Sequence, residues 1–584
     1  MAIKVLSDLR KKQNEEVDIR TLFPAISNFR FSPEVKSCPQ CSKRLHVLKT
    51  KKRTVITMSI GSFIAHETYL FCPYHGKIHR PDDLQQLVPF KGTYGYDVLV
   101  HVGKSLYLRS MSEKAIKKEL ELMAIKITEN GIRYLGQKFI AYLNICHQQS
   151  QLKLRLKMAQ NGGYILHIDG TCEGDSPHLF TGMDEISGII LSSIKINSEK
   201  KDKIVPFLKD IKERYGIPLA VVSDMGKGLM AAVEEVFPGV IYLICHFHFL
   251  RDIGKDLLEA VYRDLRNLLT KSKIRVALHN KAKDFEKKLG KQVKELGKIN
   301  SNPELASVKT ALLIIHWIFD TSLLSGYGFP FDMKHFVFYK RLVAGYEKTK
   351  QLFDLNGGKP FYQLMKLLDR IINDKDMKQA ASFLEDNEKV FNELREALRI
   401  TLADGKKGLN DNGENYDMKS ISDRVAEFIE KYASSKHKAH KKMIKQIRKY
   451  YAKLFADPIP VMVSGSEIHI QPQRTNNIME RLFRHLKRYL RKKSGNLSVK
   501  RSIAAMMPGT LLVRNLENEE YLELMLDGAD DLEQRFAQID SHLFLNEFSK
   551  MRSHNKKISA DVRKLIKEDN SLDKIEKMFL AIAS

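Results

Sequence analysis

The sequence contains few cysteines, a single tryptophan and no long apolar run. Six cysteines in 584 residues are too sparse for a disulfide framework, which favours a reducing compartment. No segment approaches the roughly 18 apolar residues that span a bilayer. The best candidate, ALLIIHWIFD (Ala311–Asp320), is short and contains a histidine, so we expect a buried helix. The N-terminus lacks the apolar core of a signal peptide. These absences predict a cytoplasmic protein with no membrane partner.

Acidic residues are also in deficit. The 97 lysines and arginines outnumber the 70 aspartates and glutamates, giving a net charge of +27. Such a surplus favours a polyanionic partner, nucleic acid first and an acidic membrane surface second. The alternative, a soluble protein with a solvated basic face, is disfavoured because the surplus is clustered in 436–454 and 481–493. With 43% apolar residues and this length, three or four globular domains are expected.

The cysteines that are present fall in a pattern. CPQC provides Cys38 and Cys41, and CPYH provides Cys72 and His75 after an intervening segment that alternates like a hairpin. Two knuckles brought together by a hairpin would form a Cys3His zinc site of the ribbon type. His79 is a possible substitute for His75, and two unrelated cysteine turns are the alternative.

Residues 112–143 carry two helical patterns. Ser112 and Thr128 are candidate N-caps for consecutive amphipathic helices with a tight joint. This arrangement suits a helix-turn-helix whose second helix presents Arg133 and Lys138 to DNA. Any small helical bundle is nearly as compatible with the pattern.

From Tyr164 onward the pattern changes to strands. Three apolar runs, with the second turn around Ile186 to Gly188, precede helices that alternate with further strands. A meander followed by alternating strands and helices is typical of a mixed α/β sheet. In order, the expected elements are strands YILHIDGT, HLFTGMDE and GIILSSIKI, helix KDKIVPFLKDIKERYG, strand IPLAVVSD, helix GKGLMAAVEEVFPG and strand VIYLICHFH.

The remaining sequence is predominantly helical. Residues from about Phe249 to Ala456 read as helices, interrupted by a flexible Gly/Asn/Asp-rich loop at Ala403–Met418. One further helix begins near TNNIMERLFRHLKR, with Thr475 to Asn477 as its cap. Ordinary surface helices are expected from about Leu532.

Three acids stand where they could share metal ions. Asp169 and Asp224 end apolar strands, the position at which α/β sheets place their sites. Glu480 lies near the start of a helix, beside nine lysines and arginines between residues 481 and 501. A cage of carboxylates suits hard ions such as Mg²⁺ or Mn²⁺, and two such ions can clamp the attacking and leaving oxygens of a phosphodiester. A buried Asp169 is then tolerated because a cation replaces its water. The alternative for Glu480 is a surface acid paired with Arg484.

These motifs resemble those of DDE transposases of the Mutator-like and bacterial insertion-sequence type. SDMGKGLMAAVEEVFPGVIYLICHFHFLRDI resembles the family's Cys-x-x-His block, here Cys245 and His248, and RTNNIMERLFRHLKR resembles the block around its last acid. The 256 residues between Asp224 and Glu480 match relatives in which a helical domain interrupts the core.

The resemblance implies a fold and a function. It implies an α/β ribonuclease-H-like core interrupted by an all-α insertion domain, preceded by zinc-ribbon-like and helix-turn-helix-like regions. The segments are a zinc-binding region 1–93, a helical DNA-binding region 94–160, core parts 161–250 and 457–531, a helical insertion 251–456 and C-terminal helices 532–584.

The implied activity is metal-dependent cleavage and strand transfer of a mobile element. Asp169, Asp224 and Glu480 would hold two Mg²⁺ or Mn²⁺ ions, and DNA (terminal inverted repeats and target) would be the partner. A homodimer in a prokaryotic cytoplasm, associated with the nucleoid through DNA, is expected from the family. The basic residues of the last core helix predicted to contact DNA are Arg481, Arg484, Lys487, Arg488 and Arg491.

Several roles stay open. Cys245 and His248 could belong to a structural zinc site, which would need two further ligands, or His248 could position a phosphate. Trp317 could stack on a base, as an aromatic residue does in a related superfamily, but a core position is expected. Glu173 and Asp175 are interpreted as solvated turn acids. The rival functions are a ribonuclease-H-like nuclease or resolvase, and a domesticated DNA-binding regulator, against which the intact acid triad argues.

Overall fold

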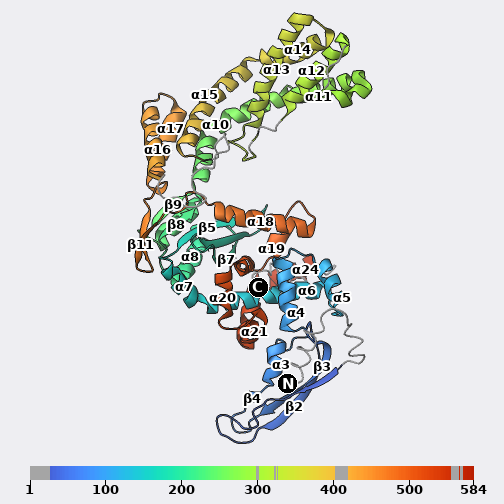
Figure 1. Ribbon diagram of the computed structural model, residues 1–584, viewed down its shortest axis with the longest axis vertical. Coiled ribbons are helices and arrows are strands. Elements are labelled where there is room, and N and C mark those ends of the chain that lie inside the picture. The colour runs from blue at the N-terminus through green and yellow to red at the C-terminus, as the bar shows by residue number, and fades with distance from the viewer. Residues whose placement is uncertain are drawn as a thin grey trace.

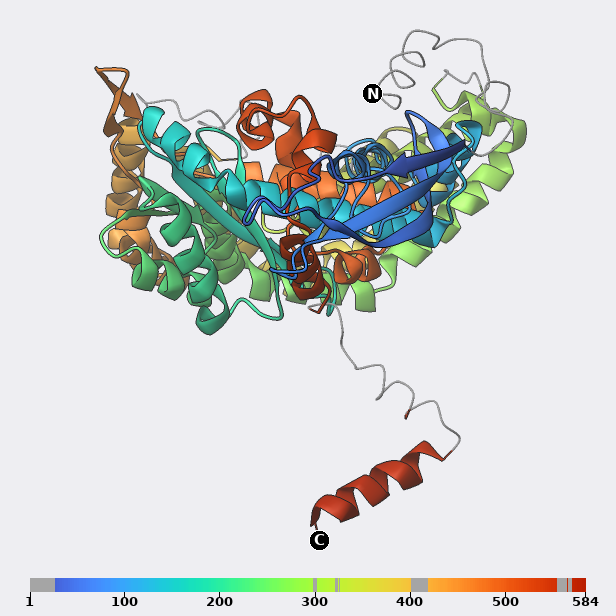
Figure 2. The ribbon, with the colours of Figure 1, turned by 90° about the horizontal axis from the view of Figure 1, so that it is seen from below.

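The computed structural model describes residues 27–297, 302–320, 326–400, 418–553 and 570–583, together with the single residues 324 and 565. The molecule is a mixed α/β protein with an elongated shape. Figure 1 shows a small sheet at one end, a helix-covered sheet in the middle and an arm of helices at the other end. Helix α24 (Ser571–Ala583) stands apart from the rest in Figure 2. Among the described residues, no helix is both long and apolar enough to cross a membrane.

The N-terminal sheet is built on a long hairpin. β2 and β3 pair antiparallel along their whole length, and β1 adds parallel to β3. Alternating side chains of these strands, among them Val55 and Phe63, form a small core with Leu84. The hairpin expected between the two cysteine knuckles is therefore confirmed. The elements are β1 (Ser27–Phe31), β2 (His46–Thr57), β3 (Gly61–Phe71), β4 (Ile78–His79) and α3 (Asp82–Leu87).

Four helices follow: α4 (Tyr96–Tyr107), α5 (Glu113–Leu122), α6 (Glu129–Gln149) and α7 (Gln151–Gln160). Both expected caps are confirmed, because Ser112 accepts the N–H of Ala115 and Thr128 that of Gly131, at 3.2 and 3.0 Å. The two capped helices are not a separate module, however. Helix α6 is buried on several sides and belongs to the main apolar core.

The central sheet has the strand order β7-β6-β5-β8-β9. β5, β6 and β7 form an antiparallel meander, whereas β8 and β9 run parallel to β5. This confirms the predicted mixed sheet. The strands are β5 (Ile165–Thr171), β6 (His178–Asp184), β7 (Ile190–Ile196), β8 (Ala220–Ser223) and β9 (Ile241–Ile244), with helices α8 (Lys201–Tyr215) and α9 (Lys227–Val236) between them.

The two faces of this sheet are covered differently. One face contributes residues such as Leu166, Ile168 and Val221 to the main core, which also contains residues of α8 and α9. The opposite face carries Ile165 and Val222 in a smaller cluster, packed against residues of the β10–β11 hairpin. That hairpin, β10 (Ile459–Val463) and β11 (Ser466–Ile470), is not anticipated by the sequence analysis.

The last predicted strand is too long. VIYLICHFH ends as a strand at Ile244, Cys245 is an N-cap, and His246 begins helix α10. The apolar run continues without a break because the first turn of α10 is itself partly buried, so hydrophobicity alone does not mark the boundary.

The helical arm extends from α10, and the predicted helical character of this segment is confirmed for its described residues. Positions 403–417 of the predicted loop lie outside the described residues. The elements are α10 (His246–Lys271), α11 (Ile274–Leu289), η1 (Gly290–Glu295), α12 (Pro303–Phe319), α13 (Lys334–Asn356), α14 (Lys359–Ile372), α15 (Lys375–Ala397), α16 (Met418–Ala433), α17 (Lys438–Tyr450) and η2 (Tyr451–Lys453).

Trp317 contradicts its expected core position, because its side chain is 46% exposed. Helix α12 buries Ile315 and Ile318, and Trp317 faces outward between them. The guanidinium carbon of Arg341 lies 4.9 Å from the centre of the indole ring. The helix is apolar around most of its circumference, so periodicity cannot identify its buried side.

The C-terminal part begins with α18 (Asn477–Ser494), the predicted basic helix. It continues with α19 (Lys500–Ala505), η3 (Thr510–Glu517), α20 (Glu519–Leu526), α21 (Leu532–Ala537) and α22 (Ser541–Ser553). The helices from Leu532 onward are not merely surface elements. Phe536 is fully buried and stacks on Tyr142 of α6, with ring centres 5.0 Å apart.

Candidate functional site

Strand register sets Asp169 and Asp224 side by side. β5 and β8 are parallel, and Ile168 is the partner of Ser223. The residue after each of them is an aspartate, Asp169 within β5 and Asp224 just beyond β8. Side chains alternate along strands, which puts both carboxyl groups on the face that carries Ile165 and Val222. Burial and the negative charge of Asp224 raise the pKa of Asp169 well above its ordinary value, although the N–H of Gly170 donates to Asp169 at 2.7 Å.

His248 and Cys245 complete a cluster around Asp224. Cys245 is the N-cap of α10 and His248 lies three residues later, a spacing that puts both on one side of the first turn. The Nδ1 atom of His248 lies 2.9 Å from Oδ1 of Asp224, and one donor atom from each of the three residues lies within 4.8 Å of the others. Burial opposes the charge on His248, but contacts with Asp224 and Cys245 prevail and raise its pKa to about 11.

The neighbouring His246 serves a different purpose. It is fully buried and its Nε2 lies 2.5 Å from the carbonyl oxygen of Leu454. Burial and the nearby Arg474 lower its pKa to about 3. It therefore contributes no donor to the cluster at Asp224, which among the described residues consists of three groups and not four.

Glu480 lies in the first turn of α18. Its backbone N–H bonds to the carbonyl oxygen of Asn476, and the amide of Asn476 donates to the carbonyl oxygen of Ile168 at 3.0 Å. Among the described residues, neither Glu480 nor Asp169 belongs to the group of candidate metal ligands at Asp224. The Glu480 carboxylate is partly exposed and lies 3.9 Å from the guanidinium of Arg484, so the surface ion pair considered in the sequence analysis is also present.

A buried polar network joins these elements, and sequence reasoning missed it. His167, fully buried two residues before Asp169, contacts Asn476 through Nδ1 at 2.9 Å and Glu185 through Nε2 at 2.8 Å. Glu185 also accepts the N–H of Gln473 at 3.1 Å. The signal was a histidine in an otherwise apolar strand, on the same face as the aspartate. The expected cap at 475–477 is correct in position, but Asn476 uses its side chain for this network and caps nothing.

The segment before α18 is anchored to the helical arm as well. Arg474 is fully buried and donates to the carbonyl oxygen of Leu398 at 2.7 Å. Its own carbonyl accepts the N–H of His246 at 2.9 Å. The beginning of α10, the end of α15 and the segment that leads into α18 therefore meet at one residue, Arg474.

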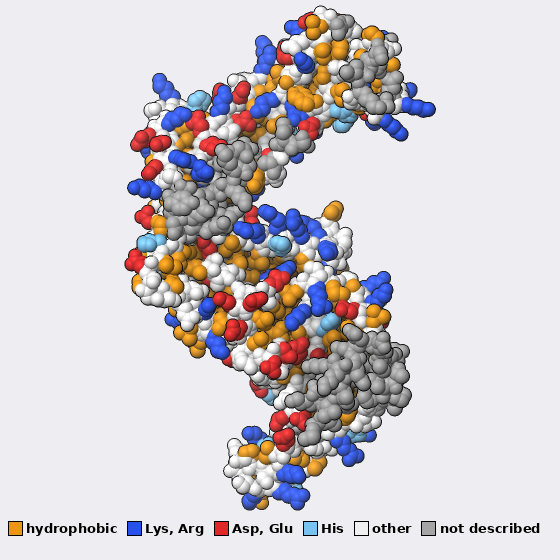
Figure 3. Space-filling model, viewed as in Figure 1, with side chains coloured by type: hydrophobic (Ala, Val, Ile, Leu, Met, Phe, Trp, Pro, Cys, Tyr) orange, Lys and Arg blue, Asp and Glu red, His pale blue; other side chains and the backbone are white. Residues whose placement is uncertain are grey.

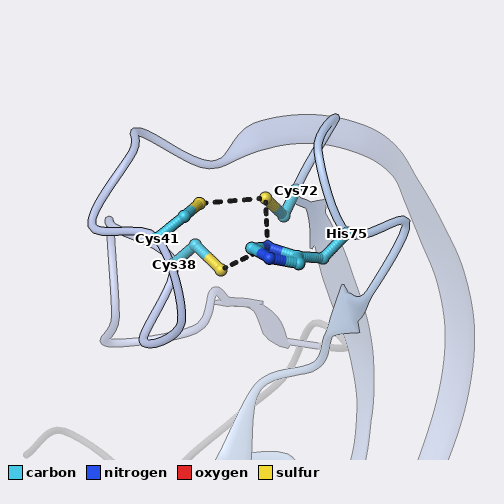
Figure 4. A group of neighbouring side chains, drawn as sticks. All are labelled: Cys38, Cys41, Cys72 and His75. Atoms are coloured by element: carbon cyan, nitrogen blue, oxygen red, sulfur yellow. Dashed lines mark hydrogen bonds between the residues drawn. The ribbon is translucent and has the colours of Figure 1, made fainter.

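The predicted zinc ligands converge in the N-terminal sheet (Figure 4). The donor atoms of Cys38, Cys41, Cys72 and His75 all lie within 4.8 Å of one another. Sulfur–sulfur and sulfur–Nδ1 separations of 3.6–3.7 Å suit the vertices of a tetrahedron around one ion. Backbone N–H groups led by that of Gln40 lower the pKa of Cys38 to about 6 despite its burial. His79 pairs with Leu70 in the sheet and is not part of this group.

The predicted basic side chains differ in their surroundings. On α18, Arg481, Arg484, Arg488 and Arg491 are exposed and Lys487 is partly exposed, opposite a buried stripe that includes Phe483 and Leu486. Figure 3 shows lysines and arginines gathered over α18, where the molecule is hollowed below the helical arm.

The two predicted DNA-contacting residues of α6 are held by neighbouring side chains or partly buried. Arg133 contacts Glu113 at 3.3 Å. Lys138 is partly buried near Tyr134, and burial lowers its pKa.

Glu173 is more than a solvated turn acid. It accepts the N–H of Val499 at 3.0 Å and lies 3.6 Å from Arg491. Contacts with Ser498 and these partners lower its pKa. Asp175 likewise forms an ion pair with Lys500. Both acids tie the β5–β6 turn to the segment that follows α18.

The fold and these acids define a class: a mixed α/β protein with carboxylates at the carboxyl ends of neighbouring parallel strands. Residues 100–307 match the family model described as "Transposase, Mutator family". The resemblance drawn from the motifs is therefore confirmed for residues 100–307, which carry a Mutator-family transposase domain. The matched segment contains Asp169, Asp224, Cys245 and His248, while Glu480 lies beyond it.

Other comparisons add little. A comparison with curated proteins gives no match. Among solved structures, the "Drosophila P element transposase strand transfer complex" is similar at 10% identity, over 67% of this chain and 78% of that chain, with a TM-score of 0.19. A score this low supports no structural argument.

Proposed function

We propose that this protein is a DDE transposase that cleaves DNA and transfers strands of a mobile element. The observation that carries the proposal is the register of β5 and β8, in which Asp169 and Asp224 directly follow the paired residues Ile168 and Ser223, together with the start of α18 held against β5. The three acids come from positions up to 311 residues apart in the sequence. Buried hydrogen bonds connect the segments that carry Asp169 and Glu480, and unrelated surface acids would not need such bonds.

We also propose that the central sheet is a ribonuclease-H-like core. Its support is the strand order β7-β6-β5-β8-β9, in which an antiparallel meander precedes two strands parallel to the first. On this proposal, 161–250 and 457–531 form one core and 251–456 is an insertion. The segments 1–93, 94–160 and 532–584 remain the proposed zinc-binding, DNA-binding and C-terminal parts.

The acids fit divalent metal ions. Asp169 and Asp224 repel each other and the pKa of Asp169 is raised, and a bound cation would offset this repulsion. Asp169, Asp224 and Glu480 would hold Mg²⁺ or Mn²⁺, which supplies charge stabilisation at the attacking and leaving oxygens of a phosphodiester. His248 would orient Asp224 and stand near an incoming phosphate. In the N-terminal sheet, Cys38, Cys41, Cys72 and His75 would hold a structural Zn²⁺.

DNA would lie along the exposed basic side of α18. Arg481, Arg484 and Arg488 project there, and guanidinium groups suit phosphate oxygens. Lys487, Arg491, Arg133 and Lys138 are further proposed contacts. A homodimer holding two DNA ends follows from the family resemblance.

Strand-transfer assays test this function. Purified protein, Mg²⁺, end-labelled DNA taken from the flanks of the gene, and a target plasmid should yield cleaved ends and then joined products. Cleavage without joining would indicate a nuclease or resolvase. Binding without cleavage would indicate a regulator, and either result would overturn the proposal.

A further inference from the structure

The strongest unassigned feature is the buried chain of polar groups from Glu185 through His167 to Asn476. None of these side chains is exposed enough to meet DNA, since His167 and Asn476 have no exposed surface. Each buried polar group costs free energy unless its partners are in place. These contacts therefore fix the relative positions of β5, the β6–β7 turn and the segment that leads into α18.

The orientation of the Asn476 amide is determined by its two partners. Its nitrogen donates to the carbonyl oxygen of Ile168 at 3.0 Å, so its oxygen faces Nδ1 of His167 at 2.9 Å. On the other side of the ring, Nε2 faces the Glu185 carboxylate at 2.8 Å. Both ring nitrogens of His167 therefore have a polar partner within hydrogen-bond distance, one from the segment before α18 and one from the β6–β7 turn.

The network makes two contacts with the segment that leads into α18. Asn476 holds the residue at which the helix begins, and Glu185 accepts the backbone N–H of Gln473, three residues earlier. In addition, the N–H of Asn476 points at the sulfur of Cys245 at 3.3 Å. The start of α18 is thus fixed to β5, to the β6–β7 turn and to the start of α10.

We infer that His167, Glu185 and Asn476 are positioning residues that set the place of Glu480 relative to Asp169 and Asp224. This inference rests on the proposed function, and none of the three groups touches substrate. His167 and Ile168 immediately precede Asp169, and Asn476 precedes Glu480 by one helical turn, so the contacts lie one to four residues from the acids they would align. Partners behind metal ligands typically contribute 10–100-fold to activity or metal affinity.

Asn476→Asp is the sharpest test because it keeps size and shape but removes the donor to Ile168. A carboxylate oxygen would then face the carbonyl oxygen, and the start of α18 should shift. We expect kcat for DNA cleavage to fall by about 10–100-fold with little change in KM for DNA, and Mn²⁺ binding measured by titration calorimetry to weaken by a similar factor.

Asn387→Asp is a matched control. Asn387 of α15 is also buried, donates to a backbone carbonyl (Phe383, 2.8 Å) and contacts a histidine (His440, 3.2 Å), but it lies in the helical arm. It should lower the melting temperature about as much as Asn476→Asp while leaving kcat and Mn²⁺ affinity within about threefold of wild type. Glu185→Gln provides a second disruption, since it removes the charge facing His167, and should lower kcat in the same direction.

The outcomes separate the two ideas. If wild type neither binds Mn²⁺ nor cleaves DNA, the proposed function fails and the inference falls with it. If wild type is active and Asn476→Asp matches it in kcat and Mn²⁺ affinity, the inference alone is overturned. Equal losses of kcat in Asn476→Asp and Asn387→Asp would also overturn it, because the effect would then be general destabilisation.

Discussion

At the scale of single residues, the two alternatives for Glu480 differ in what its charge does. As a metal ligand, Glu480 supplies charge that Glu480→Gln removes while size and helix are kept. Cleavage and strand transfer should fall to a trace, with binding to transposon ends nearly unchanged, as measured with end-labelled DNA.

Glu517→Gln is the control for a surface pair, because the exposed Glu517 at the end of η3 lies 3.1 Å from Arg514. Such pairs contribute only about 0.2–0.5 kcal/mol. If Glu480→Gln and Glu517→Gln were equally active, Glu480 would be a surface acid and the ligand would be another residue.

Asp169 offers a test of metal binding that needs no DNA. Its pKa is raised in the metal-free protein, so the folded state holds its proton more tightly than the unfolded chain. The stability from that proton is complete below the ordinary pKa of 3.8 and is lost as pH rises through the folded value. At pH 7 the unfolded carboxyl is ionised, so the raised folded-state pKa makes Asp169 a destabilising group there.

Asp169→Asn should accordingly raise the melting temperature of the metal-free protein at pH 7, by about 2–4 °C for each kcal/mol relieved. The gain should shrink as the pH approaches about 4. Added Mg²⁺ should stabilise wild type and not the variant, because binding to the folded state alone shifts the equilibrium. A variant that melts below wild type at pH 7 without metal would contradict this account.

At the scale of elements, the N-terminal sheet has only a small apolar core. Seven buried residues form its cluster, and the two cysteine knuckles lie at the end of the hairpin away from it. Small modules of this kind take much of their folding energy from a structural metal. The zinc group is therefore expected to hold the knuckle end of the hairpin together.

Elemental analysis of purified protein should find one Zn²⁺ per chain, and Cys72→Ser should lose it. The variant should also be cleaved faster by protease within the N-terminal sheet. Cys172→Ser is the control, since Cys172 lies after β5 and belongs to no group of candidate ligands among the described residues. Zinc-free wild type, or zinc retained by Cys72→Ser, would remove the assignment.

At the scale of the whole molecule, positive charge is spread over several exposed surfaces. The exposed face of α18, the basic face of α17 and the exposed lysines of β2 all contribute to the net charge of +27. Affinity for DNA should therefore fall steeply with salt, because each neutralised phosphate contributes about −0.9 to the slope of log K against log salt.

The double substitution of Arg484 and Arg488 by Gln should reduce that slope by about 1.8 units. Fluorescence anisotropy at several salt concentrations measures it. Replacing Lys203 and Lys209 on α8, which covers the opposite face of the sheet, removes the same charge and should leave the slope nearly unchanged. Equal reductions by both pairs would show that net charge matters and that α18 is not the contact surface.

The sequence by itself determined the parts of this protein that depend on local pattern. The cysteine knuckles and hairpin, the caps at Ser112 and Thr128, and the meander with its following strands all follow from spacing and periodicity within short windows. The neighbouring positions of Asp169 and Asp224 could also be predicted, because parallel strands end at the same edge of a sheet.

Tertiary structure alone decided the rest. Whether Trp317 is exposed, and whether α21 is buried, depends on which side of an apolar helix meets a neighbour. The end of β9 at Ile244 was hidden because the following helical turn is apolar too. The contacts of His167 with Glu185 and Asn476 span up to 309 residues, and such partners are chosen by chain packing. Local propensity carries no information about them, since a buried polar group specifies only that some partner must exist.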